Sequence, residues 1–313
     1  MSGRSYTVTC LAGHGVGPEL MAEATRALTE VARLHGFGVD DVHVPFGGEA
    51  FARLGQRLPL STRAAYLEAD AVLVAAAEEP ELDEIEAELD LRATVTRICF
   101  PPDGDLTLLS PLSESLAEWT VEKAFAIARE RRAHLTSVEP DDRWRELVAR
   151  VADLHDGVLV EHLAASVGLR AIAFEPERFD VVVTSLHLAD ALAGAAASAD
   201  RDARVVARGR LAGNGPGLFA PVHDTPSDLA GHGVADPGPI LLAVSLLLGE
   251  GLGERAAAAT LAHALTGSGY ERARALDALA GVAAATTREF TDAVLGLLPS
   301  TVTTAEFFER IPR

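Results

Sequence analysis

The sequence predicts an α/β fold, in which short strands alternate with helices along the chain. The first strand, Tyr6–Leu11, alternates in polarity and is followed by a glycine-rich turn and by the helical apolar pattern of Glu19–His35. Ala71–Ala75 and Phe179–Thr184 are short apolar runs with the length and composition of fully buried strands. A sheet with helices on its faces accounts for this alternation.

The remaining elements follow from the same periodicities. Further strands are expected at Val39–Val44, Ala133–Val138 and Gly157–Glu161. Further helices are expected at Ser61–Ala69, Glu114–Arg132, Asp141–His155, Ala164–Ala173, His187–Ser198, Pro239–Leu248, Arg255–Leu265 and Thr287–Leu298. The acidic segment Glu78–Asp90 is expected to lie in solvent, and the glycine- and proline-rich segment Gly209–Gly233 is expected to form a long loop.

The composition excludes several classes of function. With 313 residues and 48% apolar content, the chain can build one large domain or two closely packed ones. Its net charge of −19 argues against nucleic acid or an anionic membrane as a partner, so a small-molecule ligand is expected. The chain shows no spanning apolar run or signal peptide, and Cys10 and Cys99 make no disulfide framework. We therefore expect a cytoplasmic location.

Four segments occur in an order that resembles a known family. They are Leu11–Glu19, Pro45–Gly48, Arg178–Thr184 and Pro221–Gly231. In turn they resemble the opening strand–turn–helix, the turn after the second strand, the strand before the metal-binding helix and the adenosine loop of the isopropylmalate/isocitrate dehydrogenases. These enzymes are decarboxylating 2-hydroxyacid dehydrogenases, and the resemblance covers most of the chain.

The resemblance implies a fold with two domains. Residues 1–97 and 210–313 are expected to form a large, cofactor-side domain, and residues 98–209 a smaller central α/β domain. In the family the smaller domain carries the dimer contact, so we expect a homodimer through the helices at Ala164–Ala173 and His187–Ser198. A catalytic paralogue is the other partner that the resemblance suggests. The family's dimer clasp has no counterpart here, because a helical pattern begins soon after Leu112.

The resemblance also implies a metal site, because the family's oxidative decarboxylation uses a divalent cation to polarise the reacting oxygens. The family's three metal-binding aspartates correspond to Ser166, Asp190 and Gly194, so one carboxylate remains. Magnesium usually needs more than one carboxylate, and we do not expect this site to hold it.

Two readings of Asp190 stay open. His187 lies three residues before it on the same helical face, and Glu161 or His162 could complete a site for a softer metal. Under that reading Asp190, His187 and His162 are candidate catalytic residues. Otherwise Asp190 and His187 are polar groups near a helix N-terminus, stabilised by the helix dipole.

The family's proton-transfer residues have no equivalents. Pro140 stands at the position of the family's lysine, and Lys123, the only lysine, lies on the preceding amphipathic helix. The family's tyrosine belongs to the segment that is missing here. For the substrate carboxylates, Arg92 matches one of the family's arginines and Arg97 substitutes for a second if the alignment shifts.

The cofactor loop is better preserved. Residues at matching cofactor-binding positions are His223, Asp228, Asp236 and Val16. A carboxylate at the position of Asp228 favours NAD over NADP, because it accepts from the ribose 2′-hydroxyl and repels a 2′-phosphate. Three departures are Asp224, where the family has glycine, Asp236, where the family has asparagine, and His14, where the family has aspartate. The alternative is that the loop only closes the large domain.

Three functions are consistent with this sequence. The first is a family member that has lost magnesium-dependent oxidative decarboxylation but still binds NAD, as a pseudoenzyme or regulatory subunit. The second is an oxidoreductase or decarboxylase with altered chemistry on a small hydroxy acid, using Asp190, His187, His162 and Arg92. The third is an NAD-dependent 3-isopropylmalate-type dehydrogenase.

Overall fold

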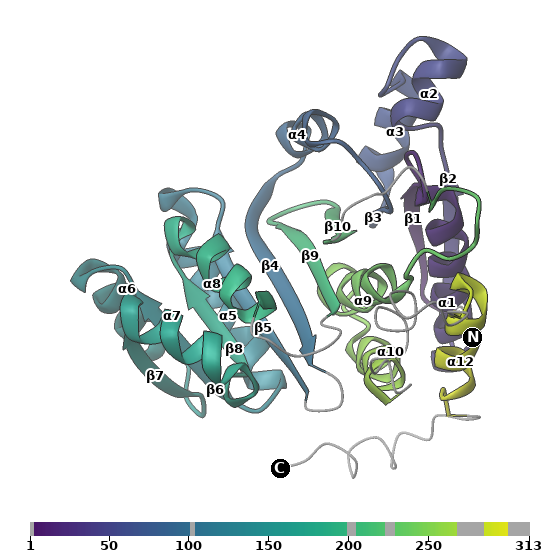
Figure 1. The fold of residues 1–313 in the computed structure, drawn as a ribbon. Helices are drawn as coiled ribbons and strands as arrows, with labels where there is room; N and C mark the ends of the chain where they lie inside the picture. The colour runs from purple at the N-terminus through teal and green to yellow at the C-terminus, as the bar shows by residue number, and fades with distance from the viewer. Residues whose placement is uncertain (1–2, 101–103, 199–204, 223–228, 268–284, 300–313) are drawn as a thin grey trace. The chain divides into compact units, whose positions relative to one another are not determined.

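The computed structural model describes residues 3–100, 104–198, 205–222, 229–267 and 285–299. The chain forms two compact units (Figure 1): a terminal unit, Met1–Asp90 with Ala207–Arg313, and a central unit, Leu91–Val206. The first boundary falls before β4 (Leu91–Phe100) rather than at residue 97, because this strand pairs along most of its length with β5 (Gly104–Pro111). The roles of the units, as cofactor-side and dimer-forming domains, remain predictions.

The terminal unit contains a mainly parallel sheet. Its strands lie in the order β2 (Gly38–His43), β1 (Ser5–Leu11), β3 (Ala71–Val74), β10 (Gly217–Pro221) and β9 (Val205–Ala212). The first four run parallel, and β9 is antiparallel to β10. All four residues of β3 are buried, as the apolar run predicts for a strand covered on both faces.

The helices of the terminal unit fall into two groups. The first group packs together and consists of α1 (Gly17–His35), α9 (Gly238–Leu246), α10 (Arg255–Gly267) and α12 (Thr287–Gly296). The second group consists of α2 (Gly47–Leu54), α3 (Leu60–Glu68) and α4 (Glu79–Glu88). Tyr66 of α3 and Ile85 of α4 are fully buried in an apolar cluster that includes Val72 of β3.

The central unit is a second α/β layer structure. Its strands lie in the order β4, β5, β8 (Val181–Thr184), β6 (His134–Glu139) and β7 (Leu159–Ala164). The β4–β5 pair is an antiparallel hairpin, and β5, β8, β6 and β7 run parallel. Helices α5 (Ala117–Glu130) and α6 (Asp142–Ala152) pack together, and so do α7 (Ala165–Phe174) and α8 (Leu186–Ser198).

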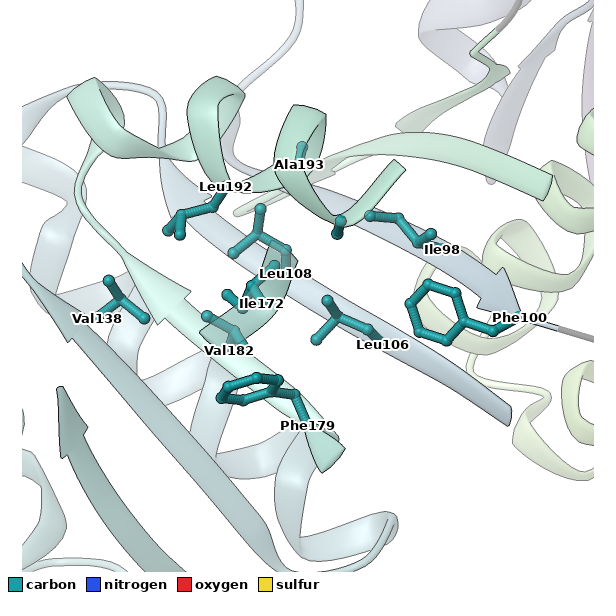
Figure 2. Close-up of a cluster of buried hydrophobic side chains, with 11 residues drawn as sticks. Ile98, Phe100, Leu106, Leu108, Val138, Ile172, Phe179, Val182, Leu192 and Ala193 are labelled. Atoms are coloured by element: carbon teal, nitrogen blue, oxygen red, sulfur yellow. The ribbon is translucent and has the colours of Figure 1, made fainter. Parts of the chain in front are cut away.

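An apolar cluster forms the core of the central unit beneath α7 and α8 (Figure 2). Phe179 and Val182 are fully buried in it, together with Ile172 of α7 and Leu192 of α8. The same helices that bury these residues therefore carry the predicted metal-binding positions. Among the described residues, no helix combines the length and the apolar character that a bilayer-spanning segment needs.

Two sequence predictions about secondary structure were wrong, and one pair of strands was missed. The expected loop Gly209–Gly233 contains half of β9 and all of β10; every second residue of β9 is buried, but two of these residues, Ala207 and Gly209, are too small to make the apolar pattern clear. The acidic segment from Glu78 is not simply solvated, because α4 buries Glu81 and Ile85. The β4–β5 hairpin was not predicted at all. The strand Tyr6–Leu11 and the helix Glu19–His35 are confirmed.

Candidate functional site

The carboxyl ends of parallel strands meet at one edge of the terminal unit's sheet. β1 pairs in parallel with both β2 and β3, and β10 pairs in parallel with β3. The chain moves outward from β1 to β2 and then crosses back to β3, on the other side of β1. Open α/β sheets bind their ligands at the carboxyl ends of the strands, where the chain makes such a change of direction.

The turn after β1 lies at this edge and packs directly against the end of β3. Gly13 has a φ of +76°, and a Cβ built on it would lie 1.6 Å from the carbonyl oxygen of Ala76. Gly17 begins α1, and a Cβ there would lie 1.9 Å from the carbonyl oxygen of Ala12. Val16, a predicted cofactor residue, is 1% exposed at the N-cap of α1. Glycine is therefore required twice in this turn for packing.

Two polar atoms of the same segment are buried without a hydrogen-bond partner among the described residues. They are Nδ1 of His14 and one carboxylate oxygen, Oε1, of Glu19. The other oxygen of Glu19 accepts a hydrogen bond from the backbone N–H of Gly233 at 3.1 Å. An unpaired buried polar atom typically costs about 1–3 kcal/mol, so each is a feature that needs a physical reason.

The chain after β10 also emerges at this edge. Its predicted cofactor residues His223 and Asp228 lie outside the described residues. Asp236 is described: its Oδ1 accepts from the backbone N–H of Gly238 at 2.8 Å and so holds the start of α9. Gly233 connects this segment to Thr287, whose backbone N–H donates to the Gly233 carbonyl at 2.8 Å. Gly233, which follows the predicted adenosine loop in the sequence, is thus hydrogen-bonded to both α1 and α12.

Glu78, at the end of the segment after β3, caps α4. The Glu78 backbone N–H donates to Oε2 of Glu81 at 3.1 Å in a capping box, and Arg57 pairs with both carboxylates, at 3.1 and 2.8 Å. These contacts of Glu78 are those of a helix start.

In the central unit, the predicted metal-site residues lie on α8. His187 and Asp190 are both exposed, and Nε2 of His187 is 3.9 Å from Oε1 of Glu114. Within the ranges that the structure describes, no three His, Cys, Asp or Glu side chains are grouped so as to hold a metal ion. His162 lies on β7 and turns toward Glu139, so it does not join His187 and Asp190 through any contact seen here.

Gly194 occupies an open position one turn beyond Asp190. No atom lies within 4 Å of a Cβ built there, so packing does not require glycine. We predict that Gly194→Ala raises the free energy of unfolding by about 0.5–1 kcal/mol, because alanine has the higher helix propensity. Urea denaturation of the two proteins measures this difference. A loss of stability would show that the position is packed.

His162 and Glu139 form a carboxylate–imidazole pair at the carboxyl ends of β6 and β7. Nδ1 of His162 lies 2.5 Å from Oε1 of Glu139, whose side chain is 6% exposed. Arg145 donates from Nε to the other oxygen at 2.8 Å, and Ser137 donates to Oε1 at 3.3 Å. Among the described residues Nε2 of His162 has no partner, and a neutral ring that donates from Nδ1 leaves Nε2 as an acceptor.

The two predicted substrate arginines have other contacts. The guanidinium of Arg92 lies over the ring of Trp119, 5.7 Å from its centroid. Arg97 donates from Nε to Asp105 at 2.5 Å and belongs to a partly buried charge network with Arg131. Their roles in substrate binding remain predictions.

The thiols of Cys10 and Cys99 are unreactive because of their surroundings. Burial raises the pKa of Cys10 and of Cys99 to about 12, so almost no thiolate forms at neutral pH. They act as small apolar core residues.

Comparison with known proteins identifies the family. The family model described as isocitrate/isopropylmalate dehydrogenase matches residues 7–96 and 108–294. The chain belongs to the isocitrate/isopropylmalate dehydrogenase family. It is 31% identical over 316 residues to a 3-isopropylmalate dehydrogenase of Salinibacter ruber, covering 83% of this chain and 86% of that protein. It is 28% identical to a 3-isopropylmalate dehydrogenase of Listeria innocua, covering 78% and 85% respectively.

Solved structures of the family share the fold. A β-decarboxylating dehydrogenase of Thermococcus kodakarensis, in its apo form, superposes with a TM-score of 0.75 at 21% identity over 94% of this chain and 96% of that one. An isocitrate dehydrogenase of Methylococcus capsulatus gives a TM-score of 0.72 at 20% identity, over 94% and 99%. The predicted fold class and family are therefore confirmed.

Sequence reasoning missed the atoms that make each site distinctive. His14 was noted only as a departure from the family's aspartate, and nothing in the sequence indicates that its Nδ1 is buried without a partner. The sequence shows Glu139 as an acidic residue at the end of an apolar strand, just before Pro140. Its link to His162 depends on the β6–β7 register, which pairs Ser137 with His162.

Proposed function

We propose that this family member binds NAD at the terminal unit and does not carry out magnesium-dependent oxidative decarboxylation. It would then act as a non-catalytic or regulatory protein. The observation that carries the proposal is on α8, where Asp190 is followed one turn later by the open position Gly194. In the family the corresponding helix offers two carboxylates, and here it offers one.

The residues present do not fit a magnesium ion. Ser166 and Gly194 replace two of the three aspartates that the family uses, and Mg²⁺ takes oxygen ligands in a strict octahedral arrangement. Pro140 cannot transfer a proton at the lysine position. We derive no catalytic step through a metal here.

The terminal unit does fit a nucleotide. The sequence Pro221–Gly231 matches the family's adenosine loop and follows β10 at the carboxyl edge of the parallel strands. His14, in the turn after the neighbouring β1, presents a buried ring nitrogen without a partner among the described residues. His223, Asp228 and Asp236 would hold the adenosine half, and NAD would supply a hydride acceptor.

A second candidate function is an altered reaction on a small hydroxy acid. The observation that favours it is the Glu139–His162 pair, because a buried carboxylate fixes the ring and leaves Nε2 available to move a proton. The third function is the activity for which the relatives are named, 3-isopropylmalate dehydrogenation with NAD.

One assay separates the three functions. NADH formation is followed with 3-isopropylmalate or isocitrate, with Mg²⁺ or with EDTA, beside an authentic 3-isopropylmalate dehydrogenase as a positive control. We predict no NADH above background in any condition. Turnover that needs Mg²⁺ would establish the third function, and turnover in EDTA that is lost in His162→Asn would establish the second.

We also propose that the chain forms a homodimer through α7 and α8. The alternative partner is a catalytic paralogue. Val167 and Phe174 of α7 are 52% and 75% exposed, and Leu159 of the neighbouring β7 is 69% exposed. Apolar side chains gathered on one helix and strand favour an interface. Light scattering on the eluting protein measures its molar mass; a monomer would reject the homodimer.

A further inference from the structure

The turn after β1 contains a ring nitrogen that the protein itself does not satisfy. Nδ1 of His14 is buried and has no hydrogen-bond partner among the described residues. Buried polar groups in folded proteins nearly always have a partner, so this nitrogen needs a physical explanation. The carbonyl of His14 accepts from the Gly17 backbone N–H at 2.9 Å, which fixes the backbone that carries the ring.

The place of His14 in the fold supports a ligand role. The residue follows β1, which lies between β2 and β3 at the point where the chain changes direction across the sheet. A Cβ built on Gly48, near the start of α2, would lie 3.6 Å from Cβ of His14. The ring therefore belongs to the carboxyl edge, beside the segment that follows β2.

The chemistry of the imidazole ring indicates which kind of ligand atom it would bind. A carboxylate, which the family has at this position, can only accept a hydrogen bond, whereas an imidazole nitrogen that carries a proton can donate one. Arg57, a nearby donor, is already paired with Glu78 and Glu81. A dinucleotide has phosphate and ribose oxygens that accept hydrogen bonds, so it needs donors at this edge.

We propose that His14 is a nucleotide-binding residue that donates its Nδ1–H to an acceptor oxygen of the bound dinucleotide. The inference rests on the proposed function, because NAD is its ligand. It adds a specific binding residue to that function. Where the family has an aspartate, which only accepts hydrogen bonds, this chain has His14, which can donate one.

The test is a calorimetric titration of the full-length chain with NAD, in the wild type and three variants. His14→Ala is expected to weaken NAD binding about tenfold, because one hydrogen bond is lost. His14→Asn is expected to stay within about threefold of the wild type, because its amide can still donate. His14→Asp is expected to weaken binding at least as much as His14→Ala, because a carboxylate only accepts and repels acceptor oxygens.

A second readout separates a ligand role from a structural one. In the absence of NAD, the melting temperature of His14→Ala is expected to equal or exceed that of the wild type, because truncation removes an unpaired buried nitrogen. His263→Ala, which removes an exposed imidazole of α10, is the matched control and should change neither quantity.

Three results would overturn the inference. The first is an NAD affinity of His14→Ala equal to that of the wild type. The second is wild-type NAD affinity in His14→Asp together with a loss of NAD affinity in His14→Asn. The third is a lower melting temperature of His14→Ala without NAD. Each of these, with normal binding by the wild type, rejects the role of His14 and leaves the proposed function standing. Absence of NAD binding by the wild type rejects both.

Discussion

Asp105→Ala is expected to lower the free energy of unfolding by about 1.5–3 kcal/mol, because it removes one partner of a partly buried charge network. The Asp105 carboxylate accepts from both terminal nitrogens of Arg131, at 3.0 and 3.2 Å, and from Nε of Arg97 at 2.5 Å. Arg131 in turn donates to Asp180, which is 1% exposed. The substitution leaves each of the two partly buried guanidinium groups with one carboxylate partner fewer.

The same network predicts a pH dependence. Burial alone would raise the pKa of Asp105, but Arg97 and Arg131 outweigh it and hold that pKa well below its usual range. The stabilisation from Asp105 is therefore complete above the pKa in the unfolded chain, about 3.9, and is lost as the pH falls toward the folded value. Chemical denaturation at a series of pH values should show the wild type and Asp105→Ala converging in acid.

A surface pair in the same unit provides the control. Glu118 and Arg150 are 3.2 Å apart, and their side chains are 60% and 61% exposed. Glu118→Ala should change stability little, because water screens such pairs. If Asp105→Ala had no larger effect than Glu118→Ala, the Asp105 network would not stabilise the central unit.

Gly13→Ala is expected to cost about 2–5 kcal/mol of stability. The left-handed backbone conformation, with φ of +76°, contributes roughly 1–2 kcal/mol of strain for a residue with a Cβ. The contact with the Ala76 carbonyl oxygen, 1.6 Å from the added atom, forces the turn and β3 apart and adds about 1–3 kcal/mol. The melting temperature and the NAD affinity should both fall, because this turn borders the proposed nucleotide site.

Gly36→Ala isolates the contribution of the clash. Gly36, at the C-cap of α1, has a similar φ of +74°, but no atom lies within 4 Å of a Cβ built there. This variant should show the strain alone. Equal losses in the two variants would mean that the turn after β1 does not pack tightly against β3.

The sequence predicts the order of the family's segments, because glycine turns, apolar strands and amphipathic helices are local patterns. It does not predict the β4–β5 hairpin or β9, because Arg97 interrupts the apolar pattern of β4 and the buried face of β9 includes the small residues Ala207 and Gly209. Arg97 lies on β4 and bonds across the hairpin to Asp105, and this partnership depends on strand register rather than on either residue's neighbours.

The candidate site also has features that the sequence predicts and features that it does not. Pro140, Ser166 and Gly194 are visible in the sequence as replacements of functional residues, because that conclusion depends only on residue type. The Glu139–His162 pair and the unpaired nitrogen of His14 depend on which side chains the fold brings together and which it leaves alone. Such non-local contacts become visible only in three dimensions.

We propose that this chain keeps a nucleotide site and needs no metal to fill it. A calorimetric titration of the purified full-length chain with NAD, in EDTA and again in Mg²⁺ with 3-isopropylmalate, tests it most directly. We predict saturable NAD binding of equal affinity in both conditions, with no heat of turnover. Absence of NAD binding, or continuous heat that appears only with Mg²⁺ and 3-isopropylmalate, would contradict the claim.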